Sequence, residues 1–352
     1  MSDEFYMKLA LDVAWRYQIL TYPNPAVGAV VVDKNGAILS VASHKKAGFL
    51  HAEPSAILEA LCKISAKFQS SFLTSYNAKF GTNYSDFSTK SSLFNPNFTY
   101  KFIEQNHNNL LKDATIYVTL EPCNHVGKTS PCSVLIKNLG FKRVVVGVLD
   151  ESSAGGGAKF LKESKIEVDV GILQQECRLL LEPFLKWSSG NFSFFKLGVS
   201  LNGVISGGII TSKDSRVLVH KFRDVIELLA ISGKTVRVDR PLLDARLVCG
   251  KAPDVLIISR QQNFDKSIPL FNVLDRKVKI SSDLSSIKSS NLTMIEGGAE
   301  LLESLKASID FVVIFVSPKF INHINLAINL EFELLCCYQI GADLCLWLKI
   351  LR

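Results

Sequence analysis

A small set of metal-binding residue types constrains most strongly what this chain can fold into. His51 and Glu53 form the tripeptide His-Ala-Glu, and Cys123 and Cys132 follow much later, each directly after a proline. An imidazole and two thiolates are common ligands of Zn²⁺, and a fourth position left open to water makes such a site catalytic. The pattern therefore indicates a fold that brings residue 51 beside residues 123 and 132, around one zinc ion per chain.

Glu53 suits a second role beside that site. Hydrolytic nucleobase deaminases combine this ligand set with a glutamate that does not bind the metal. Zinc lowers the pKa of a bound water towards ~7, and Glu53 would take the water proton and hand it to the leaving ammonia. Cys132 stands where a helix is predicted to begin, and a helix N-terminus favours the thiolate that zinc requires.

Other interpretations of the same residues stay open. A closed structural zinc site needs a fourth ligand, for which His125 is the nearest candidate, and it would leave Glu53 dispensable. The two cysteines are also compatible with thiols of a hydrophobic core. His44 suits a substrate contact and a hydrogen-bonded surface histidine equally well.

Composition and cysteine content bound the remaining classes. The 352 residues, 47% hydrophobic and 21% charged, exclude a wholly disordered chain and suit two domains. The N-terminal segment lacks the apolar core of a signal peptide, and no apolar run reaches the ~18 residues of a membrane span. We therefore expect a cytoplasmic protein without membrane association, whose 8 cysteines stay reduced. The net charge of +7 is scattered along the chain and suits an anionic small molecule.

Residues 1–150 are expected to form an α/β domain. Amphipathic segments predict helices that alternate with β-branched strands, which is typical of a sheet covered by helices. The helices are expected over 4–19, 52–64 and 132–139, and the strands around the turn 33–36 and over 115–120 and 143–150. Residues 65–112, rich in Ser, Asn and Phe without a clean period, are expected to be a surface insertion that packs through its aromatic rings. We call them the inserted segment.

A connector and a second α/β domain are expected to follow. Residues 151–190 are predicted to be a connector that is helical over 158–190, and the glycine-rich stretch 151–157 suits a turn better than a phosphate-binding loop. Residues 191–352 contain further buried strands, expected over 194–200, 255–259, 292–297 and 311–317. The glycine fingerprint of a Rossmann fold is missing, although Glu296-Gly-Gly298 can bring backbone N–H groups close to a phosphate.

Three stretches of the first half resemble one enzyme family. They are Tyr22-Pro-Asn-Pro-Ala-Val-Gly-Ala-Val-Val-Val32, Ala47-Gly-Phe-Leu-His-Ala-Glu53 and Thr119-Leu-Glu-Pro-Cys-Asn-His-Val-Gly-Lys-Thr-Ser-Pro-Cys132. In these stretches the chain is similar to the bifunctional riboflavin biosynthesis deaminase–reductases. Cytidine and tRNA adenosine deaminases typically carry Pro-Cys-x-x-Cys, whereas eight residues separate the cysteines here, as in the riboflavin family.

The resemblance implies a cytidine-deaminase-like α/β/α fold for the first domain. It makes His51, Cys123 and Cys132 the zinc ligands and Glu53 the proton shuttle, and it places Asn24 in the stretch that lines the base pocket. The amide of Asn24 can both donate to and accept from a pyrimidine edge. The interval from His51 to Cys123 is longer than usual for the family because of the inserted segment.

The second half resembles the reductase domain of the same family, which is similar in fold to dihydrofolate reductase and uses NADPH. The matching stretches are Lys196-Leu-Gly-Val-Ser-Leu-Asn-Gly203, Ile210-Thr-Ser212, Phe222-Arg-Asp224, Thr235-Val-Arg-Val-Asp-Arg-Pro-Leu-Leu-Asp-Ala-Arg246 and Glu296-Gly-Gly298. The resemblance assigns cofactor contacts to Thr235, Asp239 and Gly298, and substrate contacts to Arg223, Leu243, Arg246 and Glu296. Two arginines suit a sugar phosphate because each offers a bidentate fork.

Arg260 is a further candidate for cofactor binding. NADPH carries a 2′-phosphate that a fixed cation can recognise. Arg260 directly follows the strand expected over 255–259, and a side chain at the end of a parallel strand commonly points into the ligand crevice. Arg237 and Arg240 are rivals, but they lie in the turn already assigned to other cofactor contacts.

The resemblance implies two successive reactions on one small molecule. Zinc-dependent hydrolysis would remove an amino group from 2,5-diamino-6-ribosylamino-4(3H)-pyrimidinone 5′-phosphate. NADPH would then reduce the ribosyl group, which gives 5-amino-6-ribitylaminouracil 5′-phosphate. Such a substrate implies no nucleic-acid partner, and we expect a homo-oligomer.

Two alternatives accompany this hypothesis. The interval between Gly203 and Thr211 is short for the family, which would suit a deaminase whose reductase domain is impaired. A zinc deaminase that acts on nucleic acid would instead have a basic surface interleaved with aromatic residues and the shorter cysteine spacing.

Overall fold

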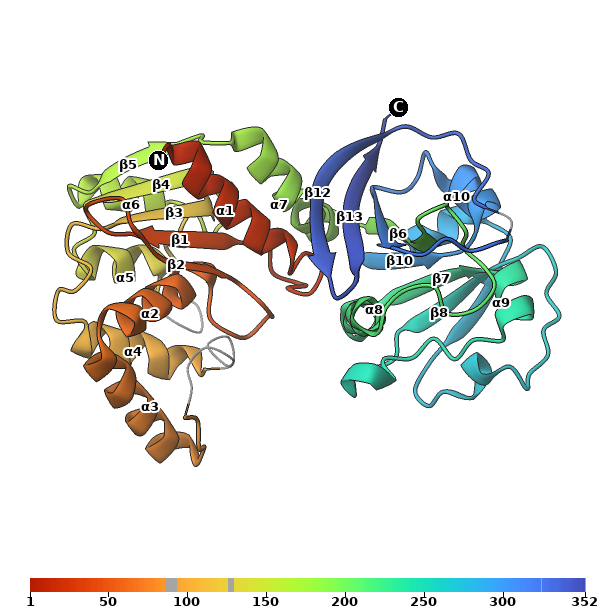
Figure 1. Ribbon diagram of the computed structural model, residues 1–352, viewed down its shortest axis with the longest axis horizontal. Helices are drawn as coiled ribbons and strands as arrows, with labels where there is room; N and C mark the ends of the chain where they lie inside the picture. The colour runs from red at the N-terminus through yellow and green to blue at the C-terminus, as the bar shows by residue number, and fades with distance from the viewer. Residues whose placement is uncertain (86–93, 126–129, 324, 352) are drawn as a thin grey trace. The chain divides into compact units, whose positions relative to one another are not determined.

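The computed structural model of the chain describes residues 1–85, 94–125, 130–323 and 325–351 (Figure 1). The chain divides into two compact units, Met1–Glu182 and Pro183–Arg352. Each unit is a sheet with helices packed on it, and each is described by itself.

The N-terminal unit is built on a five-stranded sheet in the order β2-β1-β3-β4-β5. Strand β1 (Gly28–Val32) pairs antiparallel with β2 (Ile38–Ser43) and β3 (Thr115–Leu120), whereas β3, β4 (Arg143–Val148) and β5 (Glu167–Val170) run parallel. The strands expected from the sequence are confirmed. The expectation that the connector is simply helical is wrong, because β5 lies within it: this short edge strand alternates charged residues with valine, and edge strands tolerate such a pattern.

Helices α1 and α2 cover opposite faces of this sheet. Helix α1 (Asp3–Trp15) lies so close to β1 that a Cβ on Gly28 would come 1.9 Å from one of its carbonyl oxygens. On the side of α2 (Ala52–Ile64), Ser40 Oγ donates to a carbonyl oxygen of that helix at 2.7 Å. Ser40 pairs with Val31, an odd number of positions from Gly28, and side chains alternate between the faces of a strand.

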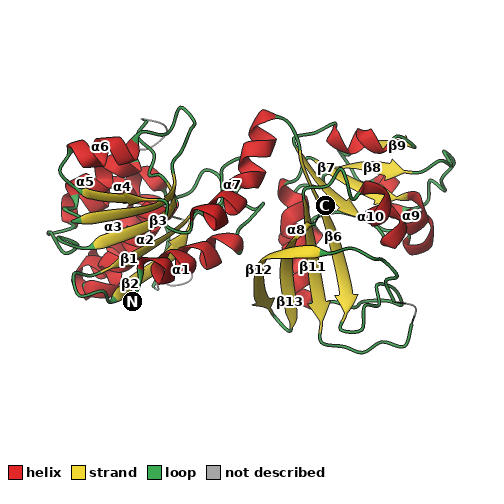
Figure 2. Ribbon diagram, turned by 90° about the horizontal axis from the view of Figure 1, so that it is seen from above, coloured by secondary structure: helices red, strands yellow, loops and turns green. Residues whose placement is uncertain are grey.

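The remaining helices of the unit extend these two layers. Helix α7 (Gln174–Ser189) lies beside α1, where Gln18 Nε2 donates to Leu180 O at 2.7 Å (Figure 2). Helix α5 (Cys132–Asn138) packs against α2 and against α6 (Gly157–Glu163). The α2 side of the sheet is therefore the side that carries the starts of two helices, α2 and α5.

The inserted segment forms two helices that its irregular composition did not predict. They are α3 (Ala66–Phe80) and α4 (Pro96–Asn106). The side chains of Ser65 and Asn95 cap their N-termini by accepting backbone hydrogen bonds, and Gly81 ends α3 in a left-handed conformation.

Aromatic rings hold the inserted segment together. Phe72 of α3 contacts Phe94, Phe98 and Phe102 with ring-centroid distances of 4.9, 5.8 and 5.2 Å. Helix α4 in turn packs against α2 and α5. The expectation that aromatic side chains anchor this segment is confirmed. Its helical period was obscured because the apolar residues gather between the two helices, and polar residues separate them in the sequence.

The C-terminal unit contains an eight-stranded sheet in the order β12-β13-β11-β6-β10-β7-β8-β9. The strands from β11 to β9 run parallel, and the hairpin β12–β13 adds two antiparallel strands at one edge. Their bounds are β6 (Phe192–Ser200), β7 (Leu228–Ser232), β8 (Asp254–Ile258), β9 (Val278–Ser281), β10 (Leu292–Glu296), β11 (Phe311–Ser317), β12 (Phe332–Ile340) and β13 (Asp343–Ile350). The four strands expected from the sequence are β6, β8, β10 and β11. The hairpin was not anticipated, because β12 is largely exposed and its apolar run is broken.

Two helices pack on opposite faces of the larger sheet. Helix α8 (Lys213–Val225) buries Phe222 against Phe194 of β6, with ring centroids 5.7 Å apart. Phe195, the next residue, belongs to the core cluster on the other face, together with leucines of α10 (Ala299–Leu305). The α8 face is the one that positions the site described below.

In the described part of the chain, no helix combines the length and the apolar character that crossing a bilayer requires.

We expect Gly28→Ala to destabilise the N-terminal unit, because the added methyl group meets the backbone of α1 rather than a movable side chain. Overpacking of this kind costs ~1–3 kcal/mol, and urea unfolding measures the loss. Gly190→Ala is the control, since the nearest atom to its Cβ would be 4.0 Å away. Equal unfolding free energies for the two variants would contradict the close approach of α1 to β1.

Candidate metal centre and cation-lined pocket

The residues predicted to bind zinc come together in the N-terminal unit. His51 directly precedes α2, Cys132 begins α5, and Cys123 lies in the loop after β3. Their donor atoms all lie within 4.8 Å of one another, with His51 Nδ1 3.4 Å from Cys132 Sγ and 3.8 Å from Cys123 Sγ. His125, the alternative fourth ligand, is exposed and lies outside this group.

A buried carboxylate fixes the loop that carries Cys123. Glu121 is 6% exposed, and its two oxygens accept hydrogen bonds from the backbone N–H groups of Ala158, at 2.7 Å, and Asp150, at 2.9 Å. These bonds tie the end of β3 to the segment after β4. Cys132 N then donates to Cys123 Sγ at 3.4 Å, which sets the second cysteine against the first.

The glycine-rich stretch 151–157 packs against the same loop. A Cβ on Gly157 would come 1.9 Å from the carbonyl oxygen of Pro122, and one on Gly155 would come 2.0 Å from that of Asp150. Asn124 N also donates to Ala154 O at 2.9 Å. The glycines therefore permit a close backbone approach beside Cys123, in agreement with a turn rather than a phosphate-binding loop.

The donor set fits Zn²⁺, which binds imidazole and thiolate ligands tetrahedrally and keeps a fourth position in catalytic sites. A hydrogen bond from Cys132 lowers the pKa of Cys123 to about 4, and His51 acts in the same direction. Burial raises the pKa of Cys132. Because zinc binds cysteine as the thiolate, metal binding would release any proton that Cys132 carries.

Glu53 is buried beside the cluster without belonging to it. It lies in the first turn of α2 and is 4% exposed. Burial, reinforced by the charge of Cys123, raises the pKa of its carboxyl to about 7 in the metal-free site. A bound divalent cation acts in the opposite direction. The carboxyl group of Glu53 can therefore act either as a proton donor or as a proton acceptor.

Asn24 and His44 form a hydrogen-bonded pair close to the metal ligands. Asn24 Nδ2 lies 3.2 Å from His44 Nε2, and His44 Nδ1 lies 2.8 Å from the carbonyl oxygen of Leu50. Because a carbonyl oxygen only accepts, Nδ1 of His44 carries the proton and Nε2 accepts from Asn24. Burial lowers the pKa of His44 to about 4, so the ring is neutral.

His44 is not a surface residue. It is 3% exposed, and its ring lies 5.7 Å from the ring of His51. The surface-histidine interpretation is therefore wrong. The bond to His44 uses one of the two N–H groups of the Asn24 amide, so its second N–H and its Oδ1 remain able to bind a ligand.

A second concave site lies between β6 and α8 in the C-terminal unit. It is a cavity of about 180 Å³ whose lining is rich in basic side chains. The lining residues are Lys196, Gly198, Thr211, Arg216, Val219, His220, Arg223 and Phe315. Burial, followed by the charge of Arg223, lowers the pKa of His220 to about 4, so the cations of this cavity are its lysine and arginines.

Glu296 balances part of this positive charge. Its carboxylate is bound by Arg223 at 3.0 Å and by Lys196 at 3.5 Å, and the residue is 9% exposed. Burial opposes its ionisation, but Arg223 and Lys196 outweigh burial and lower the pKa of Glu296 to about 2. Arg216 also lines the cavity, and its Nε is buried without a hydrogen-bond partner among the described residues.

The residues expected to contact the cofactor follow neighbouring parallel strands. Strands β10, β7 and β8 are adjacent, and their carboxyl ends lead to Gly298, to α9 (Gly233–Asp239) with Thr235, and to Arg260. The carboxyl ends of adjacent parallel strands form the ligand crevice of open α/β sheets. Asp239, the last residue of α9, has a pKa raised by burial.

The remaining sequence candidates are Leu243, Arg246 and Arg260. Leu243 is 4% exposed and adopts a left-handed φ of 57°, and Arg246 is exposed and contacts Asp244. Arg260 is exposed in the loop after β8. Its two rivals are engaged locally: Arg237 stacks on Phe264 at 4.0 Å, and Arg240 pairs with Asp265 at 2.8 Å.

The sequence predicted that Arg223 and Glu296 belong to one site. It did not single out three neighbouring side chains, those of Lys196, Arg216 and His220. Lys196 and Arg216 line the cavity with Arg223, and His220 separates Arg216 from Arg223 on α8. A lysine within the apolar stretch Phe-Phe-Lys-Leu-Gly-Val-Ser was the available signal, since a buried strand rarely carries an unpaired cation.

Comparison with known proteins finds relatives that cover most of the chain. Residues 1–148 match the family described as the cytidine and deoxycytidylate deaminase zinc-binding region. Riboflavin biosynthesis protein RibD of Aquifex aeolicus is 30% identical over 358 residues, which cover 90% of this chain and 87% of that protein. RibD of Buchnera aphidicola subsp. Baizongia pistaciae is 29% identical and covers 84% of this chain and 68% of its own.

Solved structures match almost the whole chain. A diaminohydroxyphosphoribosylaminopyrimidine deaminase/5-amino-6-(5-phosphoribosylamino)uracil reductase from Thermotoga maritima has a TM-score of 0.60 and 25% identity, and the match covers 99% of this chain and 98% of that one. RibD of Acinetobacter baumannii shows the same fold, with a TM-score of 0.58, 23% identity and 99% coverage of both chains. The expected fold class, a cytidine-deaminase-like α/β domain before a reductase-like α/β domain, is confirmed.

We expect Cys132→Ser to lose bound zinc and His125→Ala to retain it, because Cys132 belongs to the donor cluster and His125 does not. Elemental analysis of the purified full-length proteins measures zinc per chain. Loss of zinc from the His125 variant would favour the closed structural site. Full zinc content after Cys132→Ser would remove Cys132 from the ligand set.

Proposed function

We propose a reaction for each unit from the fact that the chain belongs to the RibD family of bifunctional riboflavin biosynthesis deaminase–reductases. The N-terminal unit deaminates 2,5-diamino-6-ribosylamino-4(3H)-pyrimidinone 5′-phosphate by hydrolysis. The C-terminal unit then reduces the ribosyl group with NADPH to give 5-amino-6-ribitylaminouracil 5′-phosphate. The observation that carries the proposal is the convergence of His51, Cys123 and Cys132 beside the buried Glu53.

In the deaminase site, His51, Cys123 and Cys132 hold the zinc ion, and Glu53 moves the protons. Zinc, when bound, supplies Lewis-acid activation of water. Glu53 accepts the water proton and later gives it to the departing amino group, so one C–N bond is exchanged for a carbonyl and ammonia leaves. Burial beside the metal ligands raises the pKa of this carboxyl group, which favours its role as a proton carrier.

Asn24 orients the pyrimidine in this site. One N–H of its amide donates to His44, and its Oδ1 accepts from an amino or ring N–H of the base. His44 acts here as a positioning residue, because its own Nδ1 bond to Leu50 O fixes the acceptor nitrogen. This arrangement gives the base one orientation relative to Glu53.

In the reductase site, the cation-lined cavity receives the anionic substrate. Arg223, Arg216 and Lys196 suit its phosphate, and Leu243, Arg246 and Glu296 contact the remainder of the molecule. The ribosylamine can open to an imine, whose carbon takes a hydride and whose nitrogen takes a proton. The reaction therefore needs alignment of two bound ligands rather than a protein nucleophile.

The cofactor lies at the carboxyl ends of β10, β7 and β8. NADPH, when bound, supplies the hydride. Thr235, Asp239 and Gly298 contact it, and the turn at Gly298 is open, since the nearest atom to an added Cβ would be 3.7 Å away. Backbone N–H groups of such a turn suit a phosphate.

We assign residues 1–150 to the deaminase domain, residues 151–190 to a connector and residues 191–352 to the reductase domain. The protein acts on a small molecule in the cytoplasm, without nucleic acid and as a homo-oligomer. The described cysteines form no disulfide, which is compatible with a reducing compartment.

The test is one assay with the diaminopyrimidinone ribosylamine phosphate, in which ammonia release and NADPH oxidation are followed separately. Wild type should perform both steps. Glu53→Gln should keep its zinc but release ammonia at least ~100-fold more slowly, because one group performs both proton transfers. Its NADPH oxidation on already deaminated substrate should match wild type. Deamination within tenfold of wild type would show that Glu53 is not the shuttle.

Arg260→Ala tests the choice between NADPH and NADH. A charge-assisted pair with the 2′-phosphate is worth ~1.5–3 kcal/mol, so the variant should bind NADPH ~10–100-fold more weakly. NADH binding should barely change, since NADH has no such phosphate. Fluorescence titration with both cofactors measures the difference, and equal weakening of the two would remove Arg260 from the site.

A further inference from the structure

The inserted segment reaches the metal centre through one side chain. Tyr100, in the middle of α4, has its hydroxyl oxygen 2.9 Å from Cys132 Sγ. Tyr100 is 3% exposed and Cys132 is 0% exposed, so water does not compete for this contact. The hydroxyl group of Tyr100 thus contacts a proposed zinc ligand in the buried interior of the N-terminal unit.

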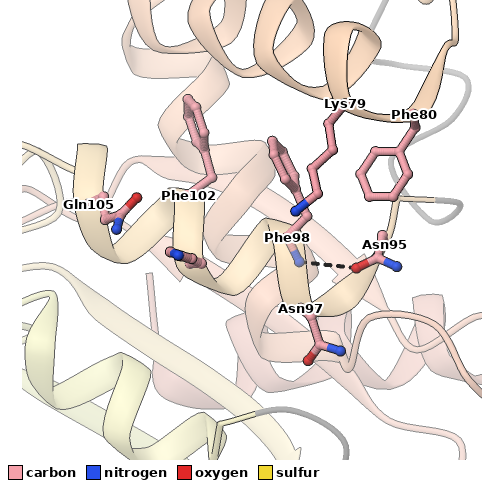
Figure 3. A pocket seen from close by; sticks show the side chains of 8 residues that line it. Lys79, Phe80, Asn95, Asn97, Phe98, Phe102 and Gln105 are labelled. Atoms are coloured by element: carbon pink, nitrogen blue, oxygen red, sulfur yellow. Dashed lines mark hydrogen bonds between the residues drawn. The ribbon is translucent and has the colours of Figure 1, made fainter.

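The helix that carries Tyr100 is held firmly at its start and along its length. Asn95 Oδ1 accepts from Phe98 N at 3.0 Å and caps the helix (Figure 3). The side chains of Phe98 and Phe102 point from α4 towards α3 (Figure 3), where their rings contact Phe72. Because α4 also packs against α2 and α5, the two helices that begin at His51 and Cys132, Tyr100 has a fixed position relative to both ligands.

The direction of the Tyr100–Cys132 hydrogen bond follows from the state of the sulfur. Either atom can donate while Cys132 is a thiol. Once Cys132 binds zinc as a thiolate it can only accept, and the neutral phenol is then the donor. A hydrogen bond to a thiolate is charge-assisted, and it is stronger than one between neutral groups.

We propose that Tyr100 is a positioning residue of the zinc site, which orients the Cys132 thiolate and stabilises it by donating a hydrogen bond. The inserted segment is therefore part of the metal centre rather than only a surface addition. This inference rests on the proposed zinc site. Outer partners of metal ligands commonly change metal affinity by ~10–100-fold when they are removed.

Tyr100→Phe removes the hydroxyl and keeps the ring. The full-length variant should bind zinc at least ~10-fold more weakly than wild type in competition with a chromophoric chelator. In the cobalt-substituted protein, the sulfur-to-cobalt charge-transfer band should move to longer wavelength. The lost hydrogen bond no longer stabilises the sulfur electrons, so less energy transfers them to the metal.

Tyr76→Phe is the matched control. Tyr76 is 5% exposed in α3, and its hydroxyl accepts from Asn95 N at 2.9 Å, so this variant also removes one buried tyrosine hydrogen bond from the inserted segment. It should leave zinc affinity and the cobalt band unchanged. Equal changes in both variants would mean that Tyr100 acts only through packing, which overturns the proposal.

The remaining outcomes also decide the question. If wild type binds zinc and Tyr100→Phe matches it in affinity and spectrum, the inference fails while the zinc site stands. If wild type binds no zinc, the proposed deaminase site fails first and the inference falls with it. Should Tyr100→Phe not fold, 3-fluorotyrosine at position 100 retains the ring and strengthens the donor, and it should shift the cobalt band to shorter wavelength. An unshifted band would overturn the proposal.

Discussion

Three donor atoms from separate parts of the chain must meet at one buried point, and much of the N-terminal unit serves that requirement. Two of the donors lie where helices begin, at His51 before α2 and at Cys132 in α5. The third, Cys123, lies on a loop, and Glu121 anchors that loop with two charge-assisted hydrogen bonds. Rigid elements thus fix two ligands, and a buried carboxylate fixes the third.

The C-terminal unit also uses a buried carboxylate to hold the groups around it in place. There the buried carboxylate of Glu296 orients Lys196 and Arg223 within the cavity between β6 and α8. A carboxylate between two cations holds them in a fixed orientation away from water. It also neutralises part of their positive charge. Arg216, whose Nε has no hydrogen-bond partner, supplies additional positive charge for an anionic ligand.

The sequence was most informative where chemistry restricts residue types. Zinc accepts few ligands, so His51, Cys123 and Cys132 could be predicted together, and the buried strands followed from their β-branched runs. The helices α3 and α4 were not predicted, because polar residues interrupt the apolar positions of the inserted segment and obscure its helical period. Arg216 and the bond from Tyr100 to Cys132 depend on contacts across elements, which a single sequence does not encode locally.

The position of α4 also limits how this chain can change in evolution. An insertion that only covers a surface can be lost again by deletion. Here α4 packs against α2 and α5, and Tyr100 contacts a cysteine that has no exposed surface. Removing the helix would uncover a sulfur and the helix faces around it, so a loss would have to be matched by simultaneous substitutions elsewhere. A deletion of residues 65–112 is therefore expected to harm the protein more than a single substitution on the outer face of α3. In evolution, the inserted segment would change by substitution rather than by loss.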